Sequence, residues 1–518
     1  MKSKTLWQAE MPVRLAGLAL AVAPAAAWSR QQPNIILFMV DDMGWQDTSV
    51  PFWTERTAQN DTFETPAMQR LADQGMLFTQ AYAAPISSPS RCSLMTGANA
   101  ARHHVTNWTL QRDTSTDLDD NDIATPDWNV NGICQTAGID HTFTARSFVD
   151  ILRAGGYHTI HIGKAHWGAA GTPGERPEHF GFDVNIGGHA AGGPATYLSE
   201  QNYGHDAQGK PTTPMHTPGL EEYWQTGTFL TEALTQECLK QLDQARSDGR
   251  PFYLYMSHYA VHIPIDRDSR YYQKYRNKGL SEKEAAYAAL IEGMDKSLGD
   301  ILGWLDSNGE AERTIVIFMS DNGGLATNSY YRDPPLYTQN APLRSGKGSL
   351  LEGGIRVPMI VRWPGMVAGG TRCNSYVMIE DFFPTLLEMA GVKHWHVPQH
   401  VDGRSFMPLL LQTGDPSQGR ALIWNYPNVW GNDGPAISLN CAIRLGRWKL
   451  IYDYKTQEKN LYDIEQDISE QHDLAADRPD IVRQLSRRLG RELRRMKAQR
   501  PVRKADGKPC PWPDKTDN

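Results

Sequence analysis

Residues 33–42 read PNIILFMVDD, an apolar run that ends in two carboxylates. A near-continuous apolar run is typical of a strand buried on both faces, because helices cover both faces of a parallel sheet. Asp41 and Asp42 would then follow the carboxyl end of that strand. In an open parallel sheet this is the edge where ligands bind. The stretch therefore predicts a buried parallel sheet with polar chemistry along one edge.

The same arrangement recurs along the chain. Three more apolar segments are followed by polar residues: 314–320 (TIVIFMS) by Asp321 and Asn322, 252–256 (FYLYM) by His262, and 158–162 (HTIHI) by Lys164 and His166. Between them, segments 148–152, 230–242 and 287–305 carry apolar residues every three or four positions, as helices do. Alternation of strands and helices predicts an α/β fold, with a mainly parallel sheet sandwiched by helices.

A second kind of stretch, residues 87–97, reads SSPSRCSLMTG. Pro89 suits the first turn of a helix, so Ser87 should lie just before a helix N-terminus, where negative charge is favoured. Arg91 adds a permanent cation whose planar donors match oxyanions. The arrangement suits a nucleophile that attacks an anionic ester, although an ordinary polar helix start has the same features.

The spacing of Ser87, Pro89, Arg91 and Thr96-Gly97 resembles the signature of the type I, formylglycine-dependent sulfatases. That family shows Cys or Ser, any residue, Pro, any residue, Arg, and then a hydrophobic residue with Thr-Gly. The resemblance implies the alkaline-phosphatase-like superfold and a formylglycine derived from Ser87. A serine-type member implies maturation by an anaerobic sulfatase-maturing enzyme that acts on the unfolded chain. Cys92 lacks the matching proline.

Two more stretches resemble family motifs: residues 156–166, which include Lys164 and His166, and residues 345–354 (SGKGSLLEGG), which include Lys347. The polar residues divide into two chemical sets. The first offers hard oxygen ligands, which suit Ca²⁺ or Mg²⁺ better than Zn²⁺; the resemblance implies one ion, usually Ca²⁺, held by Asp41, Asp42, the oxygen at position 87, Asp321 and Asn322. The second set is cationic or carries protons: Arg91, Lys164, His166, His262 and Lys347.

The resemblance implies that the hydrated aldehyde at position 87 attacks sulfur while Arg91, Lys164 and Lys347 offset negative charge. An alkoxide leaves poorly, so a general acid must protonate the bridging oxygen, and we assign this role to His262. His166 would take the remaining hydroxyl proton when sulfate is released.

Two long polar insertions, residues 99–143 and 168–228, should set specificity or else are plain linkers. Candidate hydroxyl-binding side chains are His104, Asn107, Asn185, His189, Arg332 and Asp333. The stretch 188–194 (GHAAGGP) looks like bacterial carbohydrate sulfatases, which favours a sulfated saccharide as substrate. We expect exo-action on the 4-O-sulfate of galactose or N-acetylgalactosamine, with 6-O-sulfates of galactose or glucosamine as alternatives.

The pattern changes after about residue 395. Residues 448–452 and 461–464 are expected to form an antiparallel pair, and residues 481–493 a helix with one apolar face. We therefore predict a catalytic domain at 29–395 and a C-terminal subdomain of antiparallel sheet plus helix at 396–518. Trp424, Tyr426 and Trp430 could stack on sugar rings, but core packing is the expected use of each.

The chain has 518 residues and a formal net charge of −7, from 52 basic and 59 acidic side chains. This balance gives no general attraction to nucleic acid or anionic membranes, so an enzyme for anionic substrates would concentrate its positive charge in a pocket. Residues 1–28 combine basic residues, an apolar run and small residues, as a cleaved secretory signal does. We expect a bacterial periplasmic or secreted protein without a membrane span.

Six scattered cysteines lack metal-ligand spacing, and the sequence allows one or two disulfides without pairing them. Two other functions stay open at this point. Phosphate and sulfate esters share geometry, so a phosphodiesterase or phosphonate hydrolase of the same superfold is one alternative. An inactive sulfoglycan-binding relic is the other.

Overall fold

Strand β1 (Asn34–Val40) occupies an inner position in a nine-stranded sheet, and all seven of its residues are buried. The computed structural model describes residues 32–516, so the expected signal at 1–28 lies outside the described residues. In the sheet, β1 pairs in parallel with β8 (Phe252–Ser257) and β9 (Thr314–Ser320), and β8 pairs in parallel with β6 (His158–Gly163). The four apolar segments of the sequence are therefore neighbouring parallel strands.

The remaining strands extend the sheet on both sides, in the order β11-β2-β10-β9-β1-β8-β6-β7. Their bounds are β2 (Met76–Tyr82), β7 (Val184–Ile186), β10 (Arg356–Arg362), β11 (Thr371–Cys373) and β12 (Val377–Met378), which pairs with β2. Strand β10 runs antiparallel to β9 and β2. The sheet is thus mainly parallel, as the sequence predicts.

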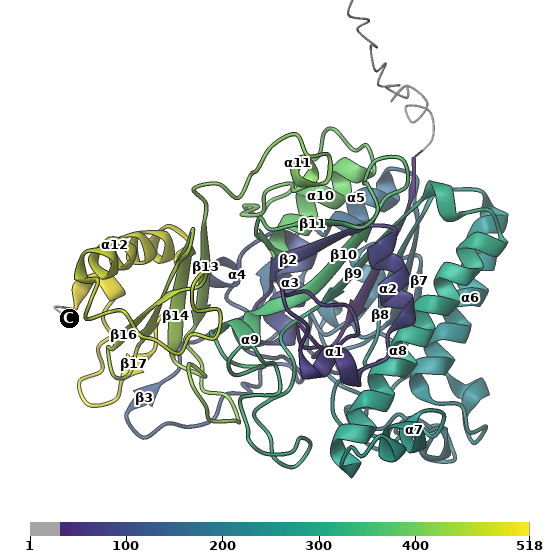
Figure 1. Cartoon of the computed structure of the whole chain (residues 1–518), viewed down its shortest axis with the longest axis horizontal. Coiled ribbons are helices and arrows are strands. Elements are labelled where there is room, and N and C mark those ends of the chain that lie inside the picture. Colours follow the sequence, from purple (N-terminus) through teal and green to yellow (C-terminus); the bar gives the residue numbers. More distant parts are fainter. Residues whose placement is uncertain (1–31, 517–518) are drawn as a thin grey trace, which may run out of the picture. The chain divides into compact units, whose positions relative to one another are not determined.

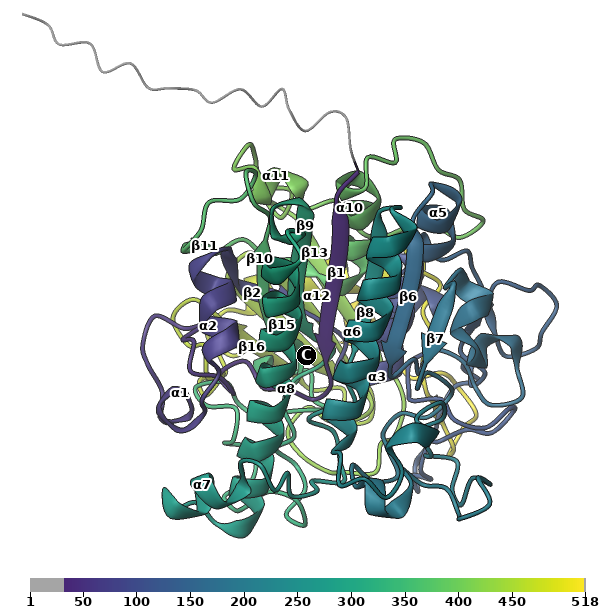
Figure 2. The same cartoon turned by 90° about the vertical axis from the view of Figure 1, so that its right-hand side faces the viewer.

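Helices cover both faces of this sheet (Figure 1). One face carries α2 (Pro66–Asp73), α6 (Leu230–Asp248) and α8 (Glu282–Ser307), and α6 and α8 stand in front of the strands in Figure 2. The other face carries α3 (Ser87–Thr96), α5 (Phe148–Ala154) and α10 (Phe382–Met389). Apolar residues at helical spacing on α8, such as Leu290, Met294 and Ile301, are fully buried. The predicted α/β sandwich is confirmed.

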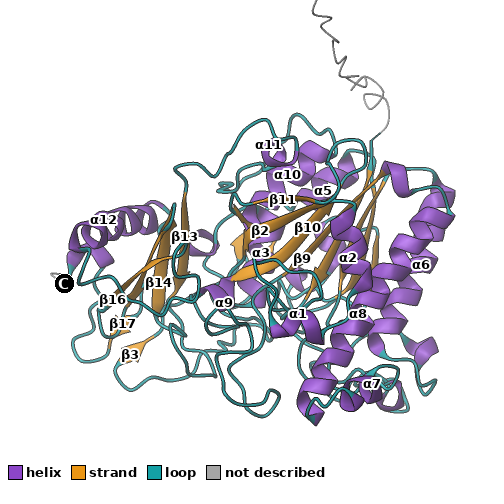
Figure 3. Ribbon diagram, viewed as in Figure 1, coloured by secondary structure: helices purple, strands orange, loops and turns teal. Residues whose placement is uncertain are grey.

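A separate four-stranded antiparallel sheet follows in the chain (Figure 3). It contains β13 (Ala421–Tyr426), β14 (Asn440–Leu445), β15 (Trp448–Asp453) and β16 (Lys459–Asp463), and α12 (Pro479–Arg495) packs on it. The expected pair at 448–452 and 461–464 and the helix at 481–493 are confirmed. Residues Pro33–Asn518 form one compact unit, so the boundary near residue 395 stays a prediction.

Short elements and loops make up the rest. The short helices are α1 (Ala58–Thr62), α4 (Ala100–His103), α7 (Tyr272–Asn277), α9 (Glu352–Ile355) and α11 (Met407–Leu410), and the short strands are β3 (Ile123–Ala124), β4 (Ile133–Cys134), β5 (Phe143–Thr144) and β17 (Val502–Arg503). Single 3₁₀ turns are η1 (Pro173–Glu175), η2 (Pro177–Phe180), η3 (Ser199–Gln201), η4 (Glu221–Tyr223), η5 (Ala311–Arg313), η6 (Ile379–Asp381) and η7 (Pro513–Lys515). The two long insertions therefore contain mostly irregular backbone.

Two global features bear on the sequence predictions. Among residues 32–516, no helix is both long and apolar enough to cross a bilayer. All six cysteines are free thiols in the structure, and five of them are buried. The disulfides that the sequence allowed are therefore not formed in the structure.

Candidate active site

The carboxyl ends of β9, β1, β8 and β6 lie side by side and bring four polar segments together. Two residues of these segments, Asp42 and His166, adopt left-handed backbone angles with φ near 61° and 58°. Such conformations are strained for non-glycine residues and persist where the surrounding structure holds a side chain in place. The structure therefore holds side chains in fixed positions at the sheet edge that the sequence predicted.

Ser87 supplies the hydroxyl at the centre of this edge. It is the first residue of α3, after the N-cap Ile86, and not the residue before the helix as expected. Its Oγ lies 3.1 Å from Asp41 Oδ1 and 3.1 Å from Asn322 Oδ1, and Lys164 Nζ donates to it at 3.0 Å. The side chain is nearly buried, so these contacts fix the hydroxyl against the sheet edge.

Two fully buried ion pairs lie beside Ser87. Arg91 pairs with Asp321 at 2.9 Å, and Lys164 pairs with Asp41 at 2.6 Å. Burial lowers the pKa of Lys164 to about 8 despite its partner Asp41. For Arg91 burial also lowers the pKa, but Asp321 outweighs this and raises it above its ordinary value. Each charge is held by a partner of opposite sign, which burial requires.

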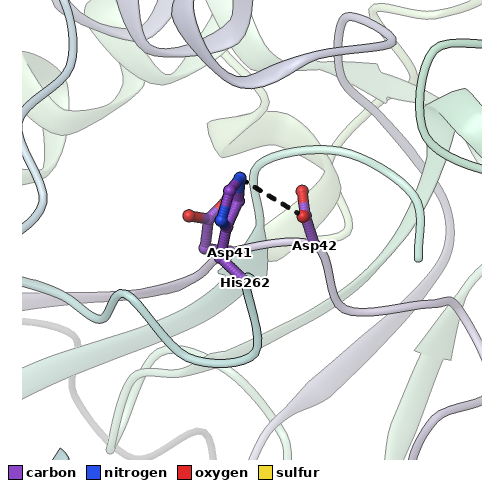
Figure 4. Close-up of side chains that lie close together, drawn as sticks. All are labelled: Asp41, Asp42 and His262. Carbon is purple, nitrogen blue, oxygen red and sulfur yellow. Dashed lines mark ion pairs between the residues drawn. The ribbon is translucent and has the colours of Figure 1, made fainter. Parts of the chain in front are cut away.

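Asp42 is the third carboxylate of the site and is bonded by Lys347 and Asn322. Lys347 Nζ donates to its Oδ2 at 2.8 Å, and the Asn322 amide donates to its Oδ1 at 2.8 Å. His262 Nε2 lies 3.7 Å from Asp42 Oδ2, and Figure 4 shows the imidazole turned toward that carboxylate. Burial lowers the pKa of Lys347, but Asp42 and Asp41 outweigh this and raise it.

The carboxylates of Asp41, Asp42 and Asp321 and the amide oxygen of Asn322 form a set of hard oxygen donors around Ser87. Such a set fits Ca²⁺ or Mg²⁺, which prefer carboxylate and amide oxygens. The ligand atoms of Asp41, Asp42 and His262 also lie within 4.8 Å of one another. His262 offers nitrogen, which suits transition metals better than Ca²⁺ or Mg²⁺, so the oxygen donors fit such an ion without it.

Hydrogen bonds fix the proton positions of the two histidines. His262 Nδ1 lies 2.7 Å from the carbonyl of Ile263, so Nδ1 carries the proton and Nε2 faces Asp42. His166 Nε2 donates to the carbonyl of Thr109 at 3.0 Å, while its buried Nδ1 has no hydrogen-bond partner among the described residues. Burial lowers the pKa of His262 to about 3 and that of His166 well below its ordinary value. In this hydrogen-bond pattern each ring has one nitrogen left that can accept a proton.

Two adjacent glycines touch the two histidines. A Cβ at Gly192 would lie 2.5 Å from the His166 ring, and a Cβ at Gly193 would lie 2.5 Å from His262 Nδ1. Real side chains never approach this closely, so backbone without a side chain is required at both positions. This gives a physical reason for the glycine pair in the stretch 188–194.

A cavity of about 590 Å³ opens above Ser87. Residues from the two insertions, the β8 and β9 loops and the C-terminal segment share its wall. The lining residues are Ile86, Ser87, Trp108, Thr116, Leu118, His166, Gly192, Gly193, Pro194, Ala195, Thr213, Met215, His262, Ile263, Pro264, Tyr331, Lys347, Trp430, Gly431 and Asn432. Both long insertions thus contribute to the wall, as expected for segments that set specificity.

The structure does not bring the six hydroxyl-binding candidates into this wall. His104 Nε2 bonds the carbonyl of Lys497, Asn107 donates to Asp117, and Asn185 bonds His161. His189 bonds the carbonyl of His216, Arg332 pairs with Glu284, and the Asp333 amide donates to Glu284. These six residues therefore shape loops and buried contacts near the site.

Several wall residues were absent from the sequence predictions. Trp108, Leu118 and Met215 lie within the insertions, where no periodicity separates a wall residue from a neighbour. For Trp430 the sequence favoured core packing over sugar stacking; it is half-buried and lines the cavity, packed on Gly348 beside Lys347. The expected core packing is confirmed for Trp424 and Tyr426, which are buried.

Residues 33–392 match the model of the family described as Sulfatase, and residues 346–499 match the model described as N-sulphoglucosamine sulphohydrolase, C-terminal. The first match covers well over half of the chain. The chain belongs to the sulfatase family. This sulfatase is therefore a sulfuric ester hydrolase, and the family generally uses Ca²⁺ and formylglycine.

Individual relatives of this sulfatase support the same family assignment. A protein named Sulfatase from Formosa agariphila is 30% identical, over 89% of this chain and 88% of the relative. The mouse (Mus musculus) protein named N-acetylgalactosamine-6-sulfatase is 30% identical, over 79% of this chain and 75% of the relative. Both likenesses extend across most of each protein.

Solved structures show the same fold. The crystal structure of Ps i-CgsB in complex with k-i-k-neocarrahexaose is 27% identical, with a TM-score of 0.69 over 89% of this chain and 93% of that one. A phosphonate monoester hydrolase of Agrobacterium radiobacter is 19% identical with a TM-score of 0.59, which shows the fold alone. The alkaline-phosphatase-like fold is confirmed.

Proposed function

We propose that this sulfatase hydrolyses carbohydrate sulfate esters, and specifically the 6-O-sulfate of N-acetylgalactosamine or galactose residues. The observation that carries the reaction is the Ser87 hydroxyl, held by Asp41, Asn322 and Lys164 at the floor of an open cavity. The names of the mammalian relatives favour the 6-O position over the 4-O position that the sequence favoured. A carbohydrate is further supported by the neocarrahexaose bound to the Ps i-CgsB structure.

Two groups complete the proposed site. Ser87 would be oxidised to formylglycine by an anaerobic maturing enzyme, and Asp41, Asp42, Asp321 and Asn322 would hold Ca²⁺. The aldehyde hydrate supplies the nucleophilic oxygen, and the ion supplies Lewis acidity. Export to the periplasm or secretion is part of the same proposal, since sulfated glycans are extracellular polymers.

The cations of the chain bind and orient the sulfate. Lys347 reaches the cavity wall and Lys164 touches the Ser87 oxygen, so both lie where charge develops during transfer. Arg91 is fully buried and bonds Asp321, Ser257 and the carbonyl of Lys164. Arg91 therefore fixes Asp321 and the Lys164 backbone.

The two histidines move protons. His262 lines the cavity, and its Nε2 lies 3.7 Å from Asp42 Oδ2. An anionic sulfate beside the ring would raise the pKa of His262, so that Nε2 can hold the proton that the leaving sugar oxygen needs. His166 lies on the same wall, and its buried Nδ1 has no hydrogen-bond partner in the described part of the chain, so it can accept a proton from the oxygen at position 87. The two nitrogens serve opposite halves of the reaction.

Ser87→Ala tests this function. We expect matured wild-type protein to release sulfate from N-acetylgalactosamine 6-sulfate or galactose 6-sulfate, and the variant to release none while keeping the wild-type melting temperature. Mass spectrometry of the peptide with Pro89 and Arg91 should show the mass of the aldehyde in active preparations only. Exhaustive chelation should abolish activity, and Ca²⁺ should restore it. Full turnover by protein with wholly unmodified Ser87 would overturn the mechanism. Faster turnover of 4-sulfates than of 6-sulfates would overturn the assignment to the 6-O position.

A further inference from the structure

The charges around the cavity are distributed unevenly. Lys347 is the one Asp, Glu, Lys or Arg side chain among the described residues that line it, and it lies at the Ser87 end, bonded to Asp42. Arg91 and Lys164 are fully buried below that end, each paired with an aspartate. All of these cations therefore serve one position, the one beside the Ser87 hydroxyl.

The rest of the wall is neutral. Apolar side chains make up most of it: Trp108, Leu118, Met215, Ile263, Pro264 and Trp430. The polar side chains beyond the Ser87 end are hydroxyls and an amide, from Thr116, Thr213, Tyr331 and Asn432. Aromatic and aliphatic faces suit the C–H faces of a sugar ring, and neutral hydroxyls and amides suit its hydroxyl groups.

We propose that the cavity accepts an uncharged sugar ring bearing a single sulfate, and that it discriminates against rings carrying a second sulfate or a carboxylate. This inference rests on the proposed function and narrows its substrate class. The first sulfate lies with Lys347 and the buried cations. A second anionic group inside the cavity would lose hydration without gaining a cation, which makes its burial unfavourable.

The exposed side chain of Leu118 gives a way to weaken this preference. Leu118 lines the cavity but is 54% exposed, and only its backbone N–H is used, in a hydrogen bond to the carbonyl of Val429. An arginine there can extend along the wall and supply the missing cation without disturbing the core. Asn432 offers a second, partly exposed position for the same change.

The experiment compares N-acetylgalactosamine 6-sulfate with N-acetylgalactosamine 4,6-disulfate. We expect kcat/KM for removal of the 6-sulfate to be at least about tenfold lower for the disulfate, because a buried unpaired charge is strongly disfavoured. Leu118→Arg or Asn432→Arg should narrow that ratio, and more so at low salt. Leu118→Gln is the matched neutral control and should keep the wild-type ratio.

Binding separates this inference from the proposed function. Calorimetry on the Ser87→Ala variant measures the Kd of both sugars without turnover, and the monosulfate should bind at least about tenfold more tightly. Equal kcat/KM and equal Kd for the two sugars would overturn the inference while leaving the 6-sulfatase activity intact. If both arginine variants keep the wild-type ratio of kcat/KM between the monosulfate and the disulfate, the electrostatic explanation of the preference is wrong. Failure to release sulfate from either sugar would instead contradict the proposed function, and the binding ratio would still decide the inference.

Discussion

Two buried clusters of charge lie on either side of one short loop. The first is the active-site cluster already described, to which Lys347 belongs. The second, here called the Glu352 cluster, contains Glu352, Arg356, Lys449 and Glu470. Lys449 Nζ lies 2.9 Å from Glu352 and 2.8 Å from Glu470, and all three side chains are fully buried. Only a few residues separate Lys347 from Glu352 in the sequence.

The clusters differ in what surrounds them. The Glu352 cluster is closed: Tyr82 donates to Glu352 at 2.6 Å, and Glu470 accepts the backbone N–H of Glu352 at 2.6 Å. The active-site cluster opens into a cavity through Ser87, His166, His262 and Lys347. Burial and opposite charges alone therefore do not identify a catalytic site. The proposed catalytic cluster has an opening, which is faced by the Ser87 hydroxyl and by a His166 nitrogen that has no partner among the described residues. This opening distinguishes it from the cluster that joins the C-terminal sheet to α9.

The comparison predicts that changes in the open cluster reduce rate. If His262 is the general acid, His262→Ala should lower kcat on alkyl sugar sulfates by about 10²–10⁴-fold, the usual contribution of such an acid. Aryl sulfates have leaving groups that need no proton, so their turnover should fall far less. Steady-state kinetics on both substrate types checks this, and equal losses on both would assign His262 to sulfate binding instead.

Changes in the closed cluster should reduce stability instead. Lys449→Met removes the cation between Glu352 and Glu470 and should lower the free energy of unfolding by about 3–5 kcal/mol, because uncompensated buried charge remains. Urea denaturation followed by near-UV circular dichroism measures this. The triple variant Lys449→Met, Glu352→Gln, Glu470→Gln leaves no buried charge of the set and should recover part of the loss. A stability loss below about 1 kcal/mol in the single variant would contradict the role given to Lys449.

The two carboxylates of the closed cluster also predict a pH effect. Burial raises the pKa of Glu470 to about 7, although the charge of Lys449 acts in the opposite direction. Burial also acts to raise the pKa of Glu352, but the charges of Lys449 and Arg356 outweigh it and lower this pKa to about 2. Between its ordinary value and about 7, folded Glu470 holds a proton that the unfolded chain has lost. Stability from this group therefore falls as pH rises through that window.

Glu470→Gln should remove this contribution. We expect the free energy of unfolding of the variant to fall by about 1–3 kcal/mol less than that of the wild type between about pH 5 and 7. Burial raises the pKa of Glu380 and Asp295 to about 7 as well, so only the difference between the two proteins is informative. Parallel stability curves for the two proteins across this range would show that Glu470 is ionised throughout.

The sequence predicted the open cluster because each of its members follows an apolar strand or sits in a fixed motif. The sequence alone places Asp41, Asp321, His262 and Lys164 at one sheet edge, since parallel strands end together. For the closed cluster the sequence carries no signal of the pairing: Glu352 lies in the same motif as Lys347 and Lys449 in a predicted strand, but they meet through packing between β15 and α9, and strands β13 and β14 were not predicted. Periodicity reports which face of an element is buried, but not which elements pack together.

The six hydroxyl-binding candidates do not line the cavity, again because the sequence does not show which segments pack together. They were chosen by residue type within loops, and loop backbone carries no periodicity that indicates direction. Trp108 and Leu118, which do line the cavity, are apolar and gave no polar signal. Hydrogen bonds between distant parts of the chain bring these segments together, such as the one from the Leu118 N–H to the Val429 carbonyl.

The smallest effect is expected at His104, which tests the boundary of the site. His104 has a φ of 56° and its Nε2 bonds the carbonyl of Lys497, away from the residues that line the cavity. Asparagine tolerates this left-handed conformation, so His104→Asn avoids the backbone strain that alanine would bring. We expect kcat/KM on a 6-sulfated sugar to stay within about twofold of wild type, with stability changed by no more than about 1 kcal/mol. A tenfold rise in KM with unchanged stability would show that the substrate extends beyond the cavity to α4, and would return His104 to the set of sugar-binding residues.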